Sequence, residues 1–336
     1  MQISKIRCII AYVYELANIL QAALKQTIFL LFLISCQLVN GQQNIDPTTF
    51  DYSKADSIAL NFPKKKYKSY TELVSPFAPL TGGLETDHEK FRVLFRWITD
   101  NISYSYGNRS SDANKVVKNK KAVCIGYSTL LKEMCSSVGI ECEVISGYSR
   151  ATINDINRKY KKTDSGHAWN AVNLYGKWYL LDVTWAAGYY DKKKGKFTKS
   201  FDELYYLTPP DIFIKEHYPK DKKWQLLDKP ITKREFTKSH IYYTGFFNNC
   251  IADLQPHKGI IKIRLKDTLE LKFKTDCKIK SRTIELNNGR FVYIPEIEFK
   301  DGTYFIKQRF EKPGIYELTL FLNGEAIAAH RLEIKK

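Results

Sequence analysis

The stretch that most constrains the fold of this chain is residues 121–140. Its apolar residues recur with the period of an amphipathic helix, at Ile125, Leu130, Leu131, Met134 and Val138. Gly139 follows, and glycine commonly ends a helix because the residue past the end needs a left-handed backbone. The pattern predicts a helix that buries one face and carries Cys124 on its first turn. Free N–H groups and the helix dipole favour a thiolate there.

A lone cysteine on a helix is more often a small buried apolar residue than a nucleophile. The residues downstream favour the nucleophile. Residues 166–183 predict a β-hairpin, in which His167 and Trp169 share one face and Ala168 and Val172 the other. Residues 175–177 supply the turn, and the return strand runs from 178 to 183.

If that turn centres on Gly176, His167 lies opposite residues 182–185, so that its imidazole and the Asp182 carboxylate meet across neighbouring strands. A thiol, an imidazole and a carboxylate in this chain order are the groups that thiol acyl transfer requires. We therefore predict Cys124 as the nucleophile, His167 as the general base and acid, and Asp182 as the group that orients the imidazole.

The same residues carry a family resemblance. A Cys that opens a helix before Gly-Tyr, then Gly-His-Ala-Trp-Asn-Ala-Val, then Trp-Tyr-Leu-Leu-Asp-Val-Thr-Trp resembles the transglutaminase-like superfamily. Residues 205–227 are similar to its kyphoscoliosis-peptidase branch. The resemblance covers roughly residues 50–240. It implies an α+β fold with a transglutaminase-like (papain-like) core and a thiol enzyme that needs no cofactor.

Two tryptophans and an oxyanion site complete this hypothesis. We expect Trp169 and Trp185 to surround the imidazole, exclude water and contact substrate; their alternative is an ordinary core role. The developing oxyanion needs hydrogen-bond donors. The backbone amide of Cys124 is the natural first donor, and the second stays open among Tyr104, Tyr106 and Asn119.

Three classes of function remain open. Hydrolysis and cross-linking share a thioester on the cysteine and differ only in the acceptor, which is water or an amine. We expect a cysteine peptidase or amidase acting on protein or peptide amides. Transglutaminase-type cross-linking is one alternative. A non-enzymatic interaction or adhesion module on the same scaffold is the other.

The net charge of +17 raises the question of a polyanionic partner. The lysine runs fall between periodic segments, where charges usually solvate loops, at residues 64–66, 118–121, 159–162 and 192–196. We therefore expect no nucleic-acid partner. Attraction to an anionic membrane or cell-surface polymer fits this charge better.

The N-terminal residues predict export. Lys25 precedes an apolar run at 27–36 that has the length of a signal peptide and is short for a spanning helix. Cleavage after Gly41 is our preferred interpretation. Residues 33–36 also resemble a bacterial lipoprotein box, and an uncleaved anchor is a further alternative. We expect a periplasmic, secreted or lipid-anchored protein with a signal segment at 1–41 and a catalytic domain at 42–235.

From residue 236 to 336, short alternating segments replace helical periodicity, at 259–265, 269–274, 280–286, 290–294, 304–310, 315–321 and 327–334. Turns are predicted at 287–289 and 323–324. This spacing is typical of an immunoglobulin-like sandwich. Upstream, residues 201–207 predict a further strand. Residues 152–164, and residues 186–190 together with the lysine-rich turn at 192–196, predict loops that border the site.

The cysteines give no sign of a metal site, because no Cys-x-x-Cys pair and no zinc-finger histidine spacing occur. Besides Cys124, we expect buried thiols that alkylate slowly, at Cys135, Cys142, Cys250 and Cys277. A Cys135–Cys142 bridge stays possible in an oxidising compartment.

Overall fold

The computed structural model describes residues 25–26, 50–63, 65–75, 77–161, 164, 166–191, 194–277, 284–287 and 291–336. The chain divides into two compact units, Met1–Asp51 and Tyr52–Lys336. The predicted export segment, including the cleavage and lipidation positions, lies outside the described residues apart from Lys25 and Gln26. Across the described ranges, no helix combines the length and apolar character that crossing a bilayer requires.

The second unit begins with helices. They are α2 (Ser53–Leu60), α3 (Tyr70–Val74), α4 (Phe77–Thr81), α5 (Asp87–Asn101), α6 (Ala113–Asn119) and α7 (Cys124–Ser137). Thr86 and Glu89 form a capping box that starts α5. A short parallel pair, β1 (Ser103–Tyr104) and β2 (Lys121–Ala122), leads into α7. The Tyr127 hydroxyl donates to the Ile102 carbonyl at 2.7 Å and ties α7 to the end of α5.

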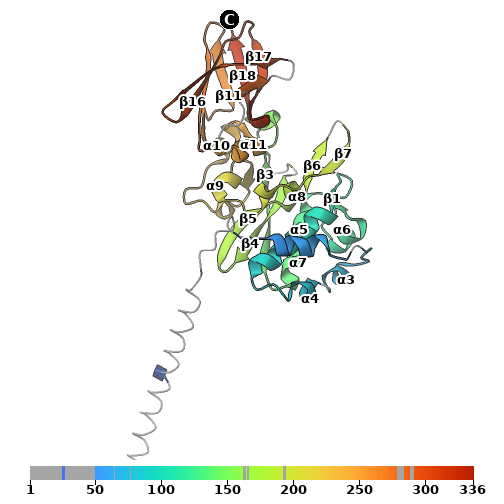
Figure 1. Cartoon of the computed structure of the whole chain (residues 1–336). Coiled ribbons are helices and arrows are strands. Elements are labelled where there is room, and N and C mark those ends of the chain that lie inside the picture. The colour runs from blue at the N-terminus through green and yellow to red at the C-terminus, as the bar shows by residue number, and fades with distance from the viewer. Residues whose placement is uncertain are drawn as a thin grey trace, which may run out of the picture. The chain divides into compact units, whose positions relative to one another are not determined.

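The predicted central helix is confirmed. It starts at Cys124, and Gly139 beyond its end has φ +77°. Its core stripe consists of Leu130, Leu131 and Met134, which are fully buried, while the outer members of the predicted stripe are half-buried. In Figure 1 α7 lies beside strand β4, against the sheet that carries the rest of the site.

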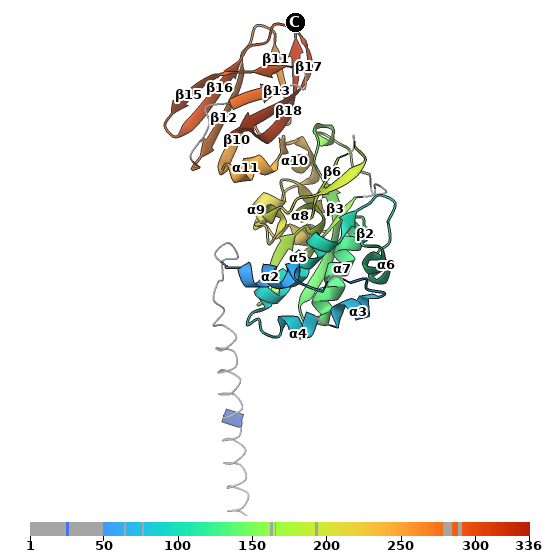
Figure 2. The same cartoon turned by 45° about the vertical axis from the view of Figure 1, so that its right-hand side comes forward.

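That sheet is antiparallel in the order β5-β4-β3-β8. Its strands are β3 (Glu141–Ser149), β4 (His167–Leu174), β5 (Lys177–Leu181) and β8 (His217–Pro219). The predicted hairpin is confirmed, because Leu174 pairs with Lys177 across a two-residue turn. Tyr175 and Gly176 have φ 55° and 81°, the positive values of a type I′ turn. Figure 2 shows β3 alongside α7 from a second side.

Short elements surround this sheet. They are η2 (Ile153–Asp155), α8 (Val183–Ala186), η3 (Glu203–Tyr205), α9 (Pro210–Phe213), η4 (Lys222–Gln225) and α10 (Lys233–Lys238). The predicted rim loop after residue 186 is instead a hairpin of β6 (Gly188–Asp191) and β7 (Lys196–Lys199). The strand predicted at 201–207 is wrong. Asp202 caps the Leu204 amide at 3.0 Å and turns the chain into η3.

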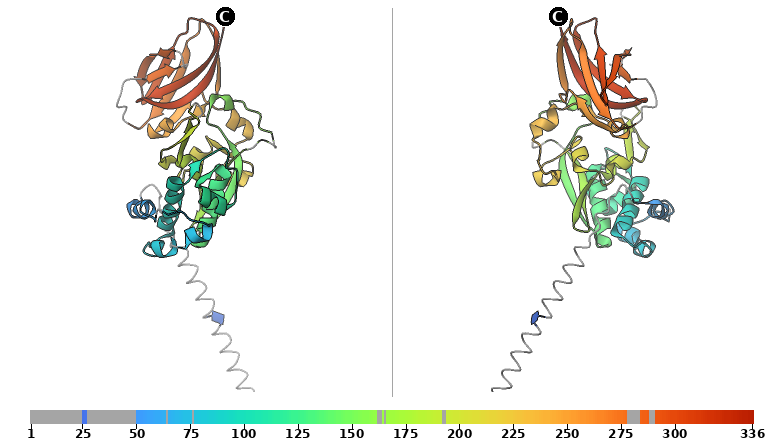
Figure 3. Two further views of the ribbon diagram at one scale, coloured as in Figure 1. Left: turned by 90° about the vertical axis from the view of Figure 1, so that its right-hand side faces the viewer. Right: turned by 60° about the vertical axis from the view of Figure 1, so that its left-hand side comes forward.

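The C-terminal region is rich in strands, as predicted. One sheet has the order β10-β12-β16-β15, and the other β11-β18-β17-β13-β14, with β9 also on β18. The strands are β9 (Ile241–Tyr242), β10 (Ile251–Gln255), β11 (Ile260–Arg264), β12 (Leu269–Thr275), β13 (Ile284–Asn287), β14 (Val292–Tyr293), β15 (Glu296–Lys300), β16 (Thr303–Gln308), β17 (Gly314–Leu322) and β18 (Glu325–Lys335). Figure 3 shows the sheets as two layers. This architecture is consistent with a β sandwich, and its immunoglobulin-like character stays a prediction.

Arg150 joins the central sheet to the segment that leads into the sandwich. Its side chain is 1% exposed. The guanidinium donates to the carbonyls of Phe236, Ser239 and His240, with 2.6 Å to Ser239 and 3.2 Å to His240. Burial lowers the pKa of Arg150 to about 10, and its nearest partners are carbonyl and hydroxyl oxygens. The guanidinium therefore keeps its hydrogen bonds only while the backbone of residues 236–240 stays in this position.

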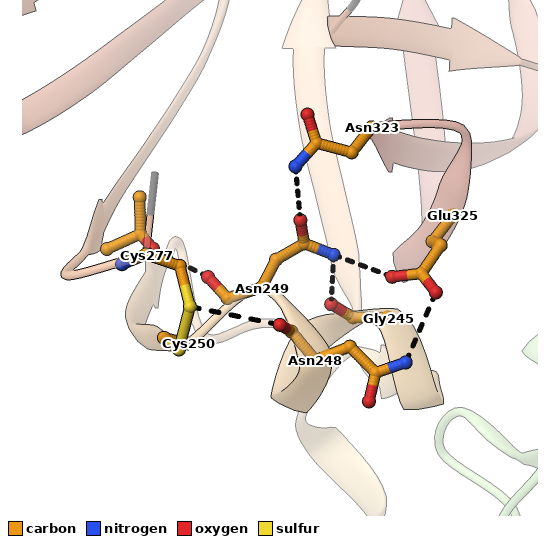
Figure 4. The surroundings of a disulfide bond; sticks show 8 residues. Gly245, Asn248, Asn249, Cys250, Cys277, Asn323 and Glu325 are labelled. Carbon is orange, nitrogen blue, oxygen red and sulfur yellow. Dashed lines mark hydrogen bonds between the residues drawn. A yellow bond between two sulfur atoms is a disulfide. The ribbon is translucent and has the colours of Figure 1, made fainter. Parts of the chain in front are cut away.

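Cys250 and Cys277 form a disulfide, which corrects the prediction of two buried thiols. Cys250 follows α11 (Thr244–Asn248), and pairing of Ile251 with Thr275 brings the two cysteines together. A polar network joins the same place to the β17–β18 turn (Figure 4): the Asn249 amide donates to Glu325 at 2.8 Å and accepts from Asn323 at 2.7 Å. Cys135 and Cys142 are free and buried, as predicted.

Loss of this disulfide should destabilise the protein. The bond joins residues 27 apart. Closing a loop of that size lowers the conformational entropy of the unfolded chain and so raises its free energy by about 3.5 kcal/mol. We expect a loss of this size in the free energy of unfolding of the Cys250→Ser/Cys277→Ser protein, measured by denaturant titration. Dithiothreitol should lower the midpoint of the wild type and leave that of the double variant in place. Equal midpoints in all four samples would contradict the pairing.

Candidate active site

The start of α7 holds Cys124 in a fixed position. Val123 before it is extended, with φ −95° and ψ 177°, and its N–H donates to the Asn108 carbonyl at 3.0 Å. Gly126 allows the loop before the helix to pack closely, because a β-carbon there would lie 2.7 Å from the Ser110 carbonyl oxygen. The thiol therefore projects from the positive end of α7 with little freedom of its backbone.

His167 is the first residue of β4 and pairs with Gly147 on β3. Gly147 has no room for a side chain, since a β-carbon would lie 2.2 Å from the Trp169 ring. Trp169 is fully buried, and its ring centre lies 6.0 Å from that of His167. The close strand pairing and the indole beneath it hold the imidazole at the start of the inner strand β4, where its side chain is 9% exposed.

Asp182 is fully buried and lies one residue past the end of β5, at the N-cap of α8. This corrects the expectation that it belongs to the return strand. Its Oδ1 accepts the amides of Thr184 and Trp185 at 2.8 and 3.0 Å. Its Oδ2 accepts His167 Nε2 at 2.5 Å. One carboxylate thus caps a helix and binds the imidazole at the same time, and His167 Nδ1 is the ring nitrogen left for the thiol.

His217 is a further member of the site, which the sequence analysis missed. It is the first residue of β8, fully buried, and its Nε2 lies 2.9 Å from Asp182 Oδ2. Its ring stacks on Phe213 at 4.1 Å and lies 4.5 Å from Trp185. The sequence signal for it is weak, because it reaches Asp182 only through the pairing of β8 with β3.

The charges of the site are strongly coupled. Burial disfavours charge on His167, but the negative charge and hydrogen bond of Asp182 raise the pKa of His167 to about 10. Burial alone would raise the pKa of Asp182, yet His167 and His217 hold it well below its usual range. Burial lowers the pKa of His217, so this imidazole stays neutral and donates its Nε2–H.

The thiol responds to the same charges. Burial opposes ionisation of Cys124, while a hydrogen bond and the positive charge of His167, together with the Ala168 amide, favour the thiolate. The net effect is a lowered Cys124 pKa. The arrangement therefore stabilises a thiolate beside an imidazolium, the reactive form of a nucleophilic cysteine.

A cavity of about 900 Å³ opens onto Cys124 and His167. Aromatic side chains dominate its wall: Tyr104, Tyr106, Trp185, Tyr189, Tyr190, Phe197, Phe201, Tyr205, Tyr242 and Tyr243. The predicted border is present in part: of the described residues within 152–164, only Thr152 lines the cavity, while the β6–β7 hairpin contributes Gly188, Tyr189, Tyr190 and Phe197. A cavity of this size with many aromatic rings is typical of a ligand-binding site.

The two tryptophans differ in position. Trp185 lines the cavity, with its ring 5.4 Å from that of His167. Trp169 packs in the core among Ile145, Phe213 and Leu180, and it does not reach the cavity. The expected contact of Trp169 with substrate therefore does not agree with its buried position. Trp169 instead packs beneath the imidazole of His167.

The three candidate oxyanion donors also differ in whether they line the cavity. Tyr104 and Tyr106 line the cavity together with Cys124. Asn119 is exposed at the end of α6 and does not line it. Burial, and next the neighbouring Cys124, raises the pKa of Tyr104 far above its usual value, so its phenol keeps its proton. Tyr104 is half-buried and interacts electrostatically with Cys124, whereas Tyr106 is 47% exposed.

His167, Asp182 and His217 also form a group with metal-ligand chemistry, because one ligand atom from each lies within 4.8 Å of the others. The fit to a metal is poor. Both imidazole Nε2 atoms already lie at hydrogen-bond distance from the same Asp182 oxygen, and a cation bound among them would break both bonds. The geometry favours a proton-sharing network.

Helix α7 carries the cysteine and packs against a sheet in which His167 begins β4, while Asp182 follows the end of β5 at the cap of α8. This arrangement defines a papain-like thiol site on a transglutaminase-like fold. Residues 77–183 match the model of the transglutaminase-like superfamily. The matched range contains Cys124, His167 and Asp182. The chain therefore carries a transglutaminase-like domain.

Two curated proteins and one solved structure are similar to this chain. Kyphoscoliosis peptidase of Mus musculus is 31% identical over 217 residues, covering 63% of this chain and 32% of that protein. Hillarin of Drosophila melanogaster is 32% identical over 216 residues, covering 60% of this chain and 26% of that protein. The crystal structure of a TGase shares 17% identity at a TM-score of 0.27, covering 52% of this chain and 42% of that one. The chain spans about a third or less of the length of these curated relatives.

The pH dependence of Cys124 alkylation should report this network. With the wild type, the rate of iodoacetamide modification should reach its plateau below the pH of a free thiol, because the Cys124 pKa is lowered. In Asp182→Asn the imidazolium loses its counter-charge, the His167 pKa falls from about 10, and the thiolate loses its partner. The alkylation profile should then move toward a midpoint of about 8.5, the free-thiol value.

The matched control is Asp211→Asn, which removes an exposed carboxylate and should leave the profile unchanged. Thermal melting checks that each variant is folded. A folded Asp182→Asn protein with the wild-type profile would exclude Asp182 from the control of Cys124.

Proposed function

We propose that this chain is an exported, thiol-dependent enzyme that hydrolyses peptide or carboxamide bonds of proteins or peptides. The observation that supports this best is the meeting of Cys124, His167 and Asp182 at one cavity, with hydrogen bonds that favour a thiolate–imidazolium pair. The transglutaminase-like domain agrees with acyl transfer through a cysteine. In this proposal residues 42–235 form the catalytic domain and residues 236–336 a β-sandwich domain.

The first half-reaction forms a thioester. The Cys124 thiolate attacks the carbonyl carbon, and the oxygen takes up the electron pair as an oxyanion. The Cys124 amide at the positive end of α7 and the Tyr104 hydroxyl donate to that oxygen. The carbon–nitrogen bond then breaks, and the imidazolium of His167 gives its proton to the departing amine or ammonia. Asp182 keeps the ring oriented throughout.

The second half-reaction hydrolyses the thioester and regenerates the free enzyme. Neutral His167 takes a proton from water, the hydroxide attacks the thioester, and the thiolate leaves with the sulfur–carbon electron pair. The imidazolium and thiolate are thereby restored, and the carboxylic acid product gives its proton to the solvent. Trp185 covers one side of the imidazole and limits access of water to the acylation step. If an amine instead of water attacks, the same thioester gives a cross-link.

Export rests on two features of the chain. A charged Lys25 and the apolar run at 27–36 have the order of a signal peptide. The Cys250–Cys277 disulfide suits an oxidising compartment. Outside the cell, the net charge of +17 would hold the enzyme near an anionic membrane or cell-surface polymer.

Removal of the thiol should abolish the activity. The exported protein is screened for peptide hydrolysis and, in parallel, for incorporation of a labelled amine. We expect hydrolysis to exceed incorporation, and Cys124→Ala to lower it by at least about 10³-fold, as loss of a nucleophile does. Cys142→Ala removes a thiol elsewhere in the fold and should retain activity below its melting temperature. Full activity without Cys124 would refute the mechanism, and amine incorporation without hydrolysis would favour cross-linking.

The Tyr104 hydroxyl gives a second, sharper test. Tyr104→Phe removes one oxyanion donor and preserves the ring, so kcat should fall about 10²-fold with little change in KM. Tyr106→Phe is the matched control, because it lines the same cavity with a more exposed ring. We expect that control to lose less than about threefold, since it removes no donor to the transition state. Equal losses in both variants would remove the special role of Tyr104.

A further inference from the structure

One wall of the cavity carries carboxyl groups that the proposed reaction does not use. Asp202 and Glu216 line it on the side of Tyr205 and Thr244. Trp185 connects this side to the reacting groups, because its ring lies 5.4 Å from the rings of both Tyr205 and His167. The acidic wall and Cys124 therefore face the same space.

Glu216 is the most unusual of these groups, because it is only 6% exposed. One carboxyl oxygen, Oε1, accepts the Tyr205 hydroxyl at 3.4 Å. Within the described part of the chain, Oε2 has no hydrogen-bond donor and no ion-pair partner. The backbone is fixed on both sides, since the Glu216 carbonyl accepts the Arg150 amide at 2.9 Å and its N–H donates to Phe213 at 3.2 Å.

Among the described residues, no lysine or arginine forms an ion pair with Glu216 or Asp202. The guanidinium of Arg150 is turned toward the carbonyls of Phe236, Ser239 and His240. Although the chain has 53 lysines and arginines, none is found among the described residues that line the cavity. Asp202 lines the same space, with Oδ1 accepting the Leu204 amide at 3.0 Å and Oδ2 accepting the Thr244 hydroxyl at 3.3 Å. The cavity is thus a locally acidic, aromatic pocket in a basic protein.

We propose that this pocket binds a cationic side chain, lysine or arginine, of the polypeptide substrate, with Glu216 and Asp202 as its counter-charges. The inference rests on the proposed acyl transfer at Cys124 and names the substrate class of that site. A lysine or arginine stem packs on aromatic rings while its charged end reaches a carboxylate. Charge-assisted hydrogen bonds to a partly buried carboxylate are strong enough to select for the cation.

The protonation of Glu216 adds a pH dependence. Burial raises the pKa of Glu216 to about 8, and the negative charges of Asp202 and Asp182 raise it further. The hydrogen bond from Tyr205 and the positive charge of Arg150 act in the opposite direction. At neutral pH the empty pocket therefore holds a neutral acid. A bound cation favours the carboxylate and releases that proton. Preference for a cation should accordingly weaken as the pH falls below 8.

The test uses the full chain and a series of peptidyl acyloxymethyl ketones, which alkylate a reactive cysteine without a defined leaving amine. The two residues before the ketone are varied among lysine, arginine, norleucine and glutamate. Intact mass gives the rate of Cys124 modification for each probe, and iodoacetamide gives the intrinsic rate of the thiol. We expect lysine or arginine at one position to react about tenfold to a hundredfold faster than norleucine at pH 8.

In Glu216→Gln that advantage should fall below about threefold, with the iodoacetamide rate unchanged. The matched control is Glu311→Gln, which removes an exposed carboxylate of the sandwich and should keep the full preference. Asp202→Asn gives a second variant if Glu216→Gln does not fold. In the wild type, the lysine-to-norleucine ratio should decline between pH 8 and pH 6, a readout that needs no variant.

The outcomes separate this inference from the proposed function. A slow iodoacetamide reaction, at the rate of an ordinary thiol, would refute both. A fast iodoacetamide reaction with equal rates for lysine and norleucine would refute the cation pocket and leave the thiol site intact. If lysine instead accelerated amine incorporation, while the lysine probe alkylated Cys124 no faster than the norleucine probe, the pocket would bind the attacking amine. That result would overturn the proposal.

Discussion

The structure of the site depends on one buried carboxylate. Asp182 has no exposed surface, and burying an ionised carboxylate without partners is very costly. Four donors offset that cost: the Thr184 and Trp185 amides on one oxygen, and the imidazoles of His167 and His217 on the other. These donors come from α8, β4 and β8. The carboxylate is therefore both the electrostatic centre of the site and the point where three elements are joined.

This arrangement gives the two histidines different states. Both share Asp182 Oδ2, and two imidazolium rings there would repel one another. His167 is partly open to the cavity and next to the thiol, so it takes the positive charge, with its pKa raised to about 10. His217 is enclosed by Phe213, Trp169 and Trp185, and burial keeps it neutral. The inner histidine thus fixes the carboxylate without competing for the proton that moves.

The parts of the fold that depend on neighbouring residues were accessible from the sequence. The period of 121–140, the glycine after it and the turn at Tyr175 and Gly176 act over a few residues, so α7 and the β4–β5 hairpin could be predicted. His217 could not, because it meets Asp182 across 35 residues through strand pairing. The Cys250–Cys277 bond depends likewise on the β10–β12 register. At 201–207 the side-chain cap of Asp202 outweighed strand propensity.

The C-terminal region also shapes the site, although its sequence shows no catalytic group. β9 pairs with β18, and the Tyr243 amide donates to the Ile327 carbonyl at 3.1 Å, so the sandwich anchors the segment at 241–248. Residues of that segment, Tyr242, Tyr243, Thr244 and Asn248, form part of the cavity wall. Arg150, which follows β3 of the catalytic sheet, holds the residues just before this segment through the carbonyls of Phe236, Ser239 and His240 and the Ser239 hydroxyl. A shift of the sandwich against that sheet would leave a buried cation unsatisfied and open the acidic wall. The stability of this junction and the shape of the cavity therefore depend on the same contacts.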